Sequence, residues 1–216
     1  MWQLPGMTGH HQHQLIIATS NPGKVRELRA LLPPDLMLLS LEDLGLSSPE
    51  EIGSTFRENA ELKAVNAAVA SGMLALADDS GLEVEALRGA PGIRSARFAG
   101  EPPDDARNRQ LLMTALADVP AAQRGARFVC AVAVSSPQGQ VWTSEGSLAG
   151  TILDHERGSG GFGYDALFML SNGRTVAELL DEEKNEMSHR GAAIKAILPK
   201  LREAILAQDA DRHSPR

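Results

Sequence analysis

The feature of this sequence that most limits its fold is a long apolar run followed closely by a turn and a second strand-like segment. The run covers Arg127–Ser135, the turn is Pro137-Gln138-Gly139, and the second segment lies near Gln140–Leu148. A connection this short is typical of two antiparallel strands that form a hairpin. Strand and helix candidates are mixed around this hairpin, so the sequence predicts a single-core α/β protein with a mixed sheet.

The remaining elements follow from apolar periodicity, capping residues and helix breakers. Four helices are predicted: one that carries Val25 to Leu32 and stops at Pro33, one from a capping box at Thr55 to Gly72, one over Asp104–Ala117, and one from near Ser188 that Pro199 should kink or break. The further strand candidates are Leu15–Ala18, Leu36–Leu39, Leu74–Ala77, Leu82–Ala86 and Ala166–Leu170.

Composition and charge exclude several classes of protein. The 21 Lys and Arg and 28 Asp and Glu residues give a net charge of −7, which argues against a duplex nucleic-acid binder, because such proteins depend on clustered positive charge. No apolar stretch approaches the roughly 20 residues that span a bilayer, so we expect no membrane partner. With one cysteine, Cys130, the chain forms no internal disulfide, and we expect a buried, inert thiol.

The two ends of the chain differ in character from the part between them. Residues 1–13, which include His10, His11 and His13, are polar and have neither the basic nor the apolar region of a secretory signal. We therefore expect a disordered extension over residues 1–13, a single domain over residues 14–207, a polar tail over residues 208–216, and a cytoplasmic protein.

A first polar cluster lies between the first strand candidate and the first helix. Backbone N–H groups at a helix N-terminus, with a lysine beside them, form an anion site suited to phosphate. The segment is no Walker A loop, because the earlier glycine at the required spacing is absent and Val25 follows the lysine. A plain turn with a solvated lysine is the alternative. The residues of this cluster are Thr19, Ser20, Asn21, Pro22, Gly23 and Lys24.

A second cluster is acidic. The segment Asp78–Gly81 (DDSG) follows the apolar strand candidate, and Glu50 and Glu51 precede the capped helix. Two neighbouring carboxylates after a buried strand are costly unless a cation neutralises them or one binds a proton. Magnesium accepts one or two carboxylates together with waters and substrate phosphates. The alternatives are an ordinary Asx turn for the aspartates and a solvated pair for the glutamates.

A third cluster is the glycine-rich segment Gly158–Asp165. Its spacing satisfies G-x-G-x-x-G, but no apolar strand precedes it and a strand rather than a helix follows it. The dinucleotide-binding fingerprint is therefore rejected. We expect a loop whose glycines let a ligand approach the backbone, with Phe162 or Tyr164 available to stack on a base.

A fourth cluster opens the last helix. Ser188 is a good N-cap, and His189 and Arg190 follow it directly, with Lys184 shortly before. Donors and positive charge at a helix N-terminus suit a carbonyl or phosphate oxygen. The alternative is simple capping with a surface arginine.

Together the clusters supply phosphate-binding cations, a paired-carboxylate magnesium site, a base-stacking loop and a reader of polar base edges, which are the parts of a nucleoside triphosphate hydrolase. These segments resemble the inosine/xanthosine triphosphate pyrophosphatases, a family that clears non-standard purine nucleotides. The resemblance is carried, in family order, by TSNPGK at 19–24, EEIGSTFRENAELKA at 50–64, ADDSGLEV at 77–84, GAPGIRSARFAG at 89–100, GGFGYDALF at 160–168 and SHRG at 188–191.

The resemblance implies an elongated mixed α/β fold with two lobes around a central nucleotide cleft, and a homodimer. It implies that ITP, dITP and XTP are hydrolysed, with magnesium, to the monophosphate and pyrophosphate. By position, Asp79 would bind magnesium and act as the catalytic base, with Glu50 favoured as the second metal ligand and Glu51 next. Thr19–Lys24 would hold the triphosphate and Ser80 would contact substrate. The other substrate-binding residues would be Phe162, Gly163, Tyr164, Asp165, Lys184, His189 and Arg190.

Base selection and three rival functions remain open at this point. Donors from Arg190 and nearby backbone would pair with O6 of hypoxanthine or xanthine and reject adenine, which carries an amine there. How GTP is excluded does not follow from the sequence. The rivals are a pyrophosphatase for modified pyrimidine triphosphates, a nucleotide sensor without turnover, and a single-stranded RNA-binding module. A sensor needs no base, and 4% aromatic residues with a negative charge disfavour RNA binding.

Overall fold

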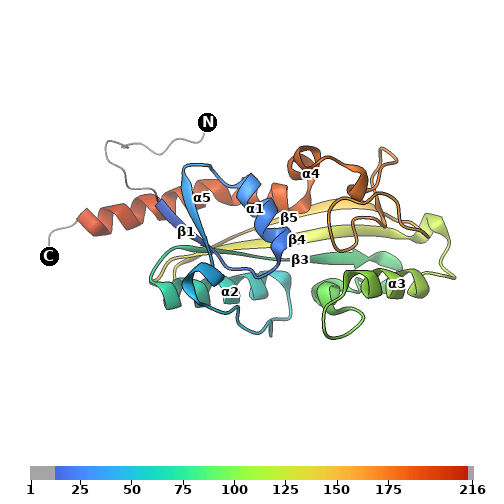
Figure 1. Ribbon diagram of the computed structural model, residues 1–216, viewed down its shortest axis with the longest axis horizontal. Coiled ribbons are helices and arrows are strands. Elements are labelled where there is room, and N and C mark those ends of the chain that lie inside the picture. The colour runs from blue at the N-terminus through green and yellow to red at the C-terminus, as the bar shows by residue number, and fades with distance from the viewer. Residues whose placement is uncertain (1–12, 214–216) are drawn as a thin grey trace.

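The computed structural model describes residues 13–213, in which one sheet extends through most of an elongated body (Figure 1). The strands are β1 (His13–Ile17), β2 (Leu36–Ser40), β3 (Ala75–Val84), β4 (Gly125–Ser135), β5 (Val141–Ile152) and β6 (Phe168–Met169). The α-helices are α1 (Pro22–Leu31), α2 (Phe56–Ser71), α3 (Asp105–Ala115), α4 (Asp181–Met187) and α5 (His189–His213), and a 3₁₀ segment, η3, covers Gly92–Arg97.

The sheet is mixed, as predicted. Within residues 13–213 its strand order is β2-β1-β3-β4-β5-β6. The strand β1 pairs in parallel with both β2 and β3, whereas β3, β4, β5 and β6 pair antiparallel in succession. The predicted hairpin is formed by β4 and β5, with Ser135 opposite Val141.

The strand β3 corrects one expectation. Two strands separated by an Asp-Asp-Ser-Gly turn were expected, but β3 is continuous, and Asp78 to Gly81 pair with Val132 to Val129 of β4. A long neighbouring strand supplies a hydrogen-bonding partner for each of these residues, and this tertiary pairing outweighs their local turn preference. Because side chains alternate along a strand, Asp78 and Asp79 point to opposite faces of the sheet.

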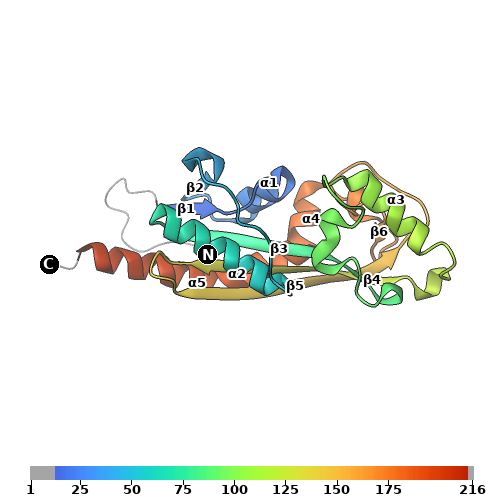
Figure 2. The same ribbon diagram turned by 90° about the horizontal axis from the view of Figure 1, so that it is seen from below.

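Three apolar clusters divide the body into two lobes joined by β3 and β4. In the first lobe, α1 and α5 cover one face of the sheet, where Leu76 lies, and α2 covers the other, where Ala75 and Ala77 lie (Figure 2). In the second lobe, Leu82 and Val84 pack against residues of α3. The polar segment of β3 lies between these cores, so the predicted two-lobed form is confirmed.

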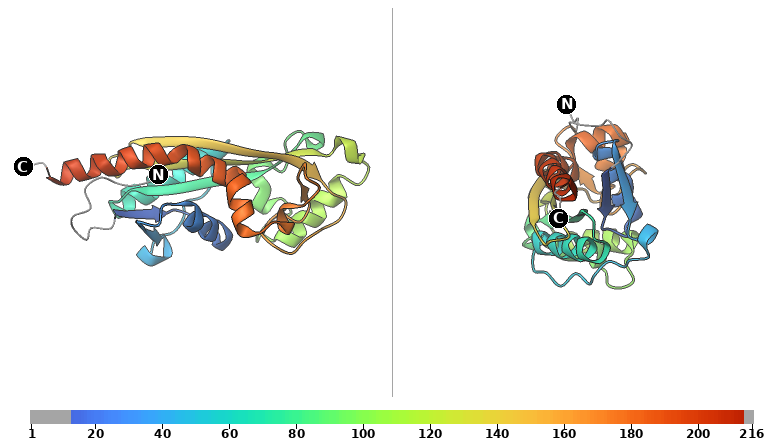
Figure 3. Two further views of the ribbon diagram at one scale, coloured as in Figure 1. Left: turned by 90° about the horizontal axis from the view of Figure 1, so that it is seen from above. Right: turned by 90° about the vertical axis from the view of Figure 1, so that its left-hand side faces the viewer.

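The ends of the domain and its last helix differ from expectation. The strand β1 begins at His13 and α5 extends to His213, so the folded part is wider than residues 14–207; His10, His11 and residues 214–216 lie outside the described residues. Figure 3 shows α5 as one unbroken helix, and Pro199 lies inside its range. Its apolar side chains on both sides of the proline, such as Ile194 and Leu201, are buried in one core, and this packing offsets the lost backbone hydrogen bond.

Thr55 caps α2 as predicted, but only half of the capping box forms. The Thr55 hydroxyl accepts a hydrogen bond from the Glu58 amide at 3.1 Å. The Glu58 carboxylate accepts from the amide and hydroxyl of Ser54 rather than from Thr55. As for membranes, no helix within residues 13–213 combines the length and apolar character needed to cross one.

Candidate functional site

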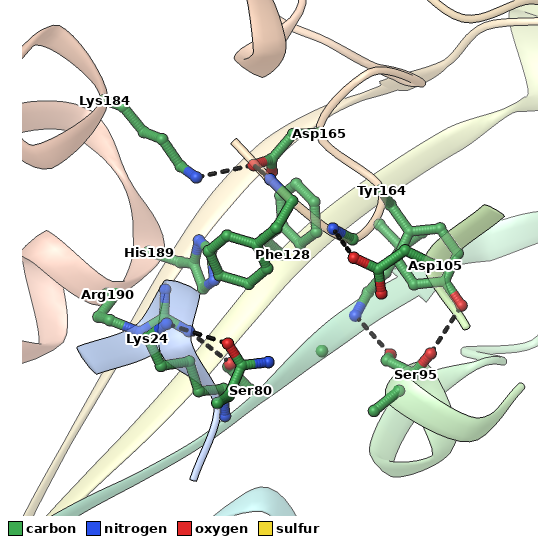
Figure 4. Close-up of a pocket in the computed structure, with 16 residues that line it drawn as sticks. Lys24, Ser80, Ser95, Asp105, Phe128, Tyr164, Asp165, Lys184, His189 and Arg190 are labelled. Atoms are coloured by element: carbon green, nitrogen blue, oxygen red, sulfur yellow. Dashed lines mark hydrogen bonds and ion pairs between the residues drawn. The ribbon is translucent and has the colours of Figure 1, made fainter. Parts of the chain in front are cut away.

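The candidate site is a cleft at a free edge of the sheet, between the lobes. The last pair between β1 and β3 joins Ile17 to Leu76, so from Asp78 to Gly81 the ladder of β3 continues on the β4 side alone. The segment after β1 contributes Asn21 and Lys24 to the cleft (Figure 4). The remaining lining residues are Ser80, Gly81, Leu82, Ser95, Ala96, Asp105, Phe128, Phe162, Gly163, Tyr164, Asp165, Lys184, His189 and Arg190.

On the α2 face of β3, a buried lysine joins two carboxylates. Lys63 Nζ lies 3.1 Å from Asp79 Oδ1 and 2.9 Å from Glu51 Oε1. Asn59, one turn earlier on α2, donates to the other Asp79 oxygen at 3.2 Å. Both α2 residues belong to a helix face that is otherwise formed largely by buried alanines, so α2 delivers a cation and an amide to Asp79.

Burial and charge act in opposite directions on these groups. Burial raises the pKa of Asp79, and the opposing effects of Lys63 and Lys24 do not cancel this rise. Burial also tends to raise the pKa of Glu51, but Lys63, Lys24 and Arg97 together lower it. Lys63 has a raised pKa, because Asp79, Asp78 and Glu51 outweigh its burial. Asp79 is therefore a carboxylate with a raised pKa, beside a lysine that stays charged.

The donor set around Asp79 fits magnesium. Two carboxylates already converge on one positive charge at Lys63 Nζ, and magnesium uses one or two carboxylates, waters and substrate phosphates rather than a cage of protein ligands. No group of three or more His, Cys, Asp or Glu side chains in the described part of the chain is arranged to hold a metal.

The partner of Asp79 is Glu51 rather than Glu50. Glu51 is half-buried and shares Lys63 with Asp79, whereas Glu50 is exposed. Glu51, the second choice from the sequence, is therefore better placed than Glu50 to share a cation with Asp79, because the chain turns only one of the two adjacent glutamates toward α2. The Glu51 carboxylate also accepts from Arg97 of η3 at 3.0 Å, which ties this segment to the second lobe.

On the opposite face of β3, Asp78 anchors two cations. Its Oδ2 lies 3.2 Å from Lys24 Nζ and 3.1 Å from Nε and Nη2 of Arg190. Burial would raise the pKa of Asp78, but Lys24 and Arg190 hold it well below its usual range. The two aspartates are therefore not one paired-carboxylate metal site: Asp78 organises the cations, and Asp79 faces α2.

The Arg190 guanidinium is held by several side chains. It is 1% exposed and donates to Asp78, to Ser80 Oγ at 2.8 Å and to Glu27. Each of its nitrogens thus donates to a side chain, and its role in reading a purine O6 stays a prediction. Arg190 lies 5.8 Å from the centre of the Phe162 ring, so its stem and charge still border the cleft.

Lys184 connects the first helix to the glycine-rich loop. Its Nζ lies 2.6 Å from Glu27 of α1 and 2.7 Å from Asp165 Oδ2, and it lies 4.7 Å above the centre of the Phe162 ring. The same Asp165 oxygen accepts from the Phe162 amide at 2.9 Å. This network fixes the loop that carries Phe162 relative to the first lobe.

The segment after β1 is only partly as predicted. Asn21 caps α1 and accepts from the amides of Gly23 and Lys24, so these two N–H groups are already bonded to a side chain. A Cβ on Gly23 would lie 2.7 Å from the Phe162 ring, so glycine is required for this contact across the cleft. Thr19, Ser20 and Pro22, which belong to the same predicted cluster, line a neighbouring hollow together with Arg26 and Arg29.

An aromatic wall closes the second-lobe side of the cleft. The rings of His189 and Phe128 stack with their centres 4.9 Å apart, and Tyr164 donates from its hydroxyl to Ser95 O at 2.8 Å. His189 Nδ1 is buried and has no hydrogen-bond partner among the described residues. Burial, then Arg190 and Lys184, lower the pKa of His189, so it is neutral at pH 7 and its Nδ1 is free to bond a ligand.

The structure joins several residues to this site that the sequence analysis did not single out. Lys63 and Asn59 carry a detectable signal, because two polar residues four apart interrupt an alanine-rich helix face. Glu27 has a weaker one, one turn after Lys24 on α1. Ser95 lies in the segment 89–100, to which no role was assigned, Asp105 and Phe128 come from segments without a motif, and only the tertiary fold brings the three to the cleft.

Comparisons with known proteins agree with this fold. The profile of the Ham1 family matches residues 15–200. A dITP/XTP pyrophosphatase of Desulforamulus reducens is 49% identical over 199 residues, which cover 91% of this chain and 99% of that protein. One from Thermus thermophilus is 49% identical over 187 residues, which cover 86% of this chain and 90% of that protein.

Two solved structures resemble the fold. A Ham1 protein from Coxiella burnetii has a TM-score of 0.80 at 38% identity, and the Ham1 protein of Staphylococcus aureus has a TM-score of 0.78 at 39% identity. Each match covers 88% of this chain and 99% of the other. The match of sequence and structure over most of the chain shows that this protein belongs to the Ham1 family.

Proposed function

We propose that this protein hydrolyses the non-standard purine nucleoside triphosphates dITP, ITP and XTP to the monophosphate and pyrophosphate. The name of its relatives, dITP/XTP pyrophosphatase, supports this activity. The observation that carries the proposal is the position of Asp79, a buried carboxylate that shares the Lys63 cation with Glu51 at the free edge of β3, within the influence of Lys24. Such hydrolysis would keep deaminated purines out of DNA and RNA.

The proposed substrate passes over the free edge of β3. The aromatic wall lies on the Asp78 face of this strand and the Asp79–Glu51 pair lies on the other. Lys24 acts on both faces, because its charge lowers the pKa of Asp78 and opposes the rise at Asp79. We infer that Lys24 and Lys184 hold the triphosphate, offsetting its negative charge in an acidic protein.

Asp79 is the proposed general base. Its raised pKa suits it to accept a proton from the attacking water, and Asn59 and Lys63 fix the direction of its two oxygens. Magnesium, the cofactor we propose, would be held by Asp79 and Glu51 and would stabilise charge on the phosphate oxygens. Lys63 keeps this carboxylate pair together when phosphate is absent.

The purine is proposed to bind against the aromatic wall. Phe162 and Tyr164 border this part of the cleft, and the neutral His189 offers an unpaired Nδ1. Asp165 positions Phe162 and Lys184, and Gly163 lines the cleft between Phe162 and Tyr164. Arg190 contributes by holding Asp78 and Ser80 in place.

We further propose a cytoplasmic homodimer with no nucleic-acid or membrane partner. Support for self-association comes from large apolar side chains on the surface: Ile52 is 76% exposed, Leu180 68% and Val69 61%. The net charge of −7 is unfavourable for binding nucleic acid. Light scattering at several protein concentrations would measure the mass of the assembly.

The deciding experiment measures pyrophosphate released from a panel of nucleotides with magnesium: dITP, ITP, XTP, GTP, ATP and a modified pyrimidine triphosphate. We expect fast release from the first three and slow release from the rest. Release of orthophosphate instead of pyrophosphate would contradict the proposed bond cleavage. Preference for the pyrimidine, or binding without turnover, would replace the proposal by one of its rivals.

A matched pair of variants tests the role of Asp79. Asp79→Asn should lower kcat for dITP by about 10²-fold or more, because general-base catalysis contributes 10²–10⁴-fold, while circular dichroism stays unchanged. Asp118→Asn, at an exposed aspartate of the second lobe, should retain full activity. A wild-type rate in Asp79→Asn at saturating magnesium would remove Asp79 from the chemistry.

A further inference from the structure

Two side chains of α3 hold one glycine of the loop that carries Phe162 and Tyr164. The Gly163 amide donates to Asp105 Oδ2 at 2.7 Å, and the Gly163 carbonyl accepts from Arg109 Nη1 at 2.9 Å. Asp105 and Arg109 are four residues apart and therefore lie on the same face of the helix. Both polar groups of a single residue are thus bonded to a helix more than 50 positions away in the sequence.

The held glycine lies between the two aromatic residues of the loop. Gly163 has a φ of 60°, in the left-handed region that favours glycine. Phe162, before it, contacts Gly23 and lies below Lys184, and Tyr164, after it, donates to Ser95 O. Because these two residues flank one backbone unit that is bonded on both sides, the bonds at Gly163 constrain how both rings face the cleft.

Arg109 also anchors a second part of the same connection. Its Nε lies 2.9 Å from Glu156 Oε1, in the segment between β5 and the glycines. Arg107, on the same helix, instead contacts Asp104 and Pro102 O. Asp105 and Arg109 therefore hold the loop, whereas Arg107, which lies between them in the sequence, contacts only the N-terminal region of α3 in these bonds.

We propose that Asp105 and Arg109 are positioning residues that act through Gly163 to hold the base-binding loop in its binding-competent form. The proposal rests on the function proposed above and deepens it, because it makes the affinity for the purine depend on two side chains of α3 that hold the base-binding loop. The pair does not touch the phosphate-side groups Lys24, Lys63 or Asp79 in any contact of the described residues. Its effect therefore falls on base binding and not on the chemical step.

The kinetic test compares Asp105→Ala and Arg109→Ala with the control Arg107→Ala. Each of the first two should raise KM for dITP about tenfold, because a hydrogen bond to a charged group is worth roughly that factor, and should leave kcat little changed. The inhibition constant of inorganic tripolyphosphate, which has no base, should stay at the wild-type value. Arg107→Ala should match wild type in all three measurements.

Two further measurements separate positioning from general damage. Asp105→Asn retains an oxygen that can accept from Gly163, so it should restore KM toward wild type. The double variant should lose less than the sum of the single losses, since both bonds hold one backbone unit. A fall in kcat at constant KM, or a parallel loss of tripolyphosphate affinity, would overturn the proposal.

Amide hydrogen exchange provides a readout that does not depend on turnover. The Gly163 amide should exchange faster in Asp105→Ala than in wild type or in Arg107→Ala, because the bond that protects it is lost. Equal exchange rates in all three proteins would overturn the proposed hold on the loop. Failure of wild type to hydrolyse dITP would instead refute the proposed function. The exchange measurement would still test whether Asp105 holds the Gly163 amide, because it does not depend on turnover.

Discussion

Lys63 shows how a single residue can serve a site before any ligand arrives. Its side chain is 4% exposed, and its ammonium lies between Asp79 and Glu51. Without it, two carboxylates would meet in a region of low dielectric, where like charges repel strongly. The lysine therefore keeps the carboxylates charged and close together.

Removing this charge gives a prediction about metal dependence. In a chelator, Lys63→Met should lower the free energy of unfolding by about 3 kcal/mol or more, because a buried charge pair loses one partner. Added magnesium should raise the melting temperature of this variant more than that of wild type, since the ion replaces the lost charge. Thermal melts with and without magnesium would measure both effects, and equal responses to magnesium would contradict the argument.

His189 gives a prediction about pH. Its pKa lies well below the ordinary 6.5, chiefly because of burial. Below pH 6.5 His189 binds a proton in the unfolded chain but stays neutral in the folded protein. The free energy of unfolding therefore decreases as pH falls, by at most about 1.4 kcal/mol for each pH unit. His189→Phe, which keeps the ring stacked on Phe128, should unfold in urea with a smaller loss of stability between pH 7 and pH 5. An unchanged pH slope would show that His189 does not contribute.

Residue-level prediction from the sequence succeeded where a motif lies in one continuous segment. Lys24, Tyr164 and His189 line one cleft, as expected. The choice between Glu50 and Glu51 could not be made in advance, because it depends on which side of a loop faces α2. The orientation of Asp78 and Asp79 depends on whether the chain turns or continues, and turn-forming residues gave the wrong local signal.

At the scale of elements, the contact between β5 and α5 controls how the start of α5 reaches the cleft. A Cβ on Gly146 would lie 2.2 Å from His189 O and 2.6 Å from Ala193 N. The missing side chain thus lets the helix lie directly against the strand. His189 and Arg190 belong to the same turn, so their positions depend on this close approach.

Gly146→Ala should therefore affect stability and activity together. Overpacking of this kind costs about 1–3 kcal/mol, and the displaced helix should also lower kcat/KM for dITP. Ser147→Ala, at an exposed neighbour on the other face of β5, is the control and should behave as wild type. Urea unfolding and steady-state kinetics would test both, and a fully stable, fully active Gly146→Ala would refute the packing argument.

Most elements were predictable because each has a local signal: apolar periodicity for α2, a cap at Thr55, and an apolar run for β4. The continuity of β3 and of α5 was not, because both depend on neighbours distant in the sequence. In β3 the neighbour is β4, which pairs with it from Ala75 to Val84. In α5 it is the sheet, against which residues on both sides of Pro199 are buried.

At the scale of the whole molecule, β3 and β4 pass through the cores of both lobes. The lobes therefore share covalent and hydrogen-bonded structure, unlike two domains joined by a linker. The mixed sheet was predictable from the hairpin. The place where the lobes meet was not, because it depends on β1 ending beside Leu76 while β3 continues.

Shared strands predict cooperative unfolding. Differential scanning calorimetry should show one transition. Its calorimetric enthalpy should equal its van't Hoff enthalpy, which indicates that both lobes unfold as one unit. Circular dichroism and hydrogen exchange of the second-lobe core should report the same midpoint. Two separate transitions, with one lobe melting first, would show that the strands do not couple the lobes.

The alternation of side chains along β3 makes the stability of the fold and the proposed chemistry depend on the same register of the strand. Asp78 belongs to the ion network that links α1 and α5, and Asp79 is the proposed base. Deletion of a single residue ahead of them would turn each toward the other's surroundings: one acid would leave its arginine, and the other would leave its lysine. Substitutions near these two positions keep both side chains on their own faces of the sheet, whereas an insertion or deletion of one residue would exchange them.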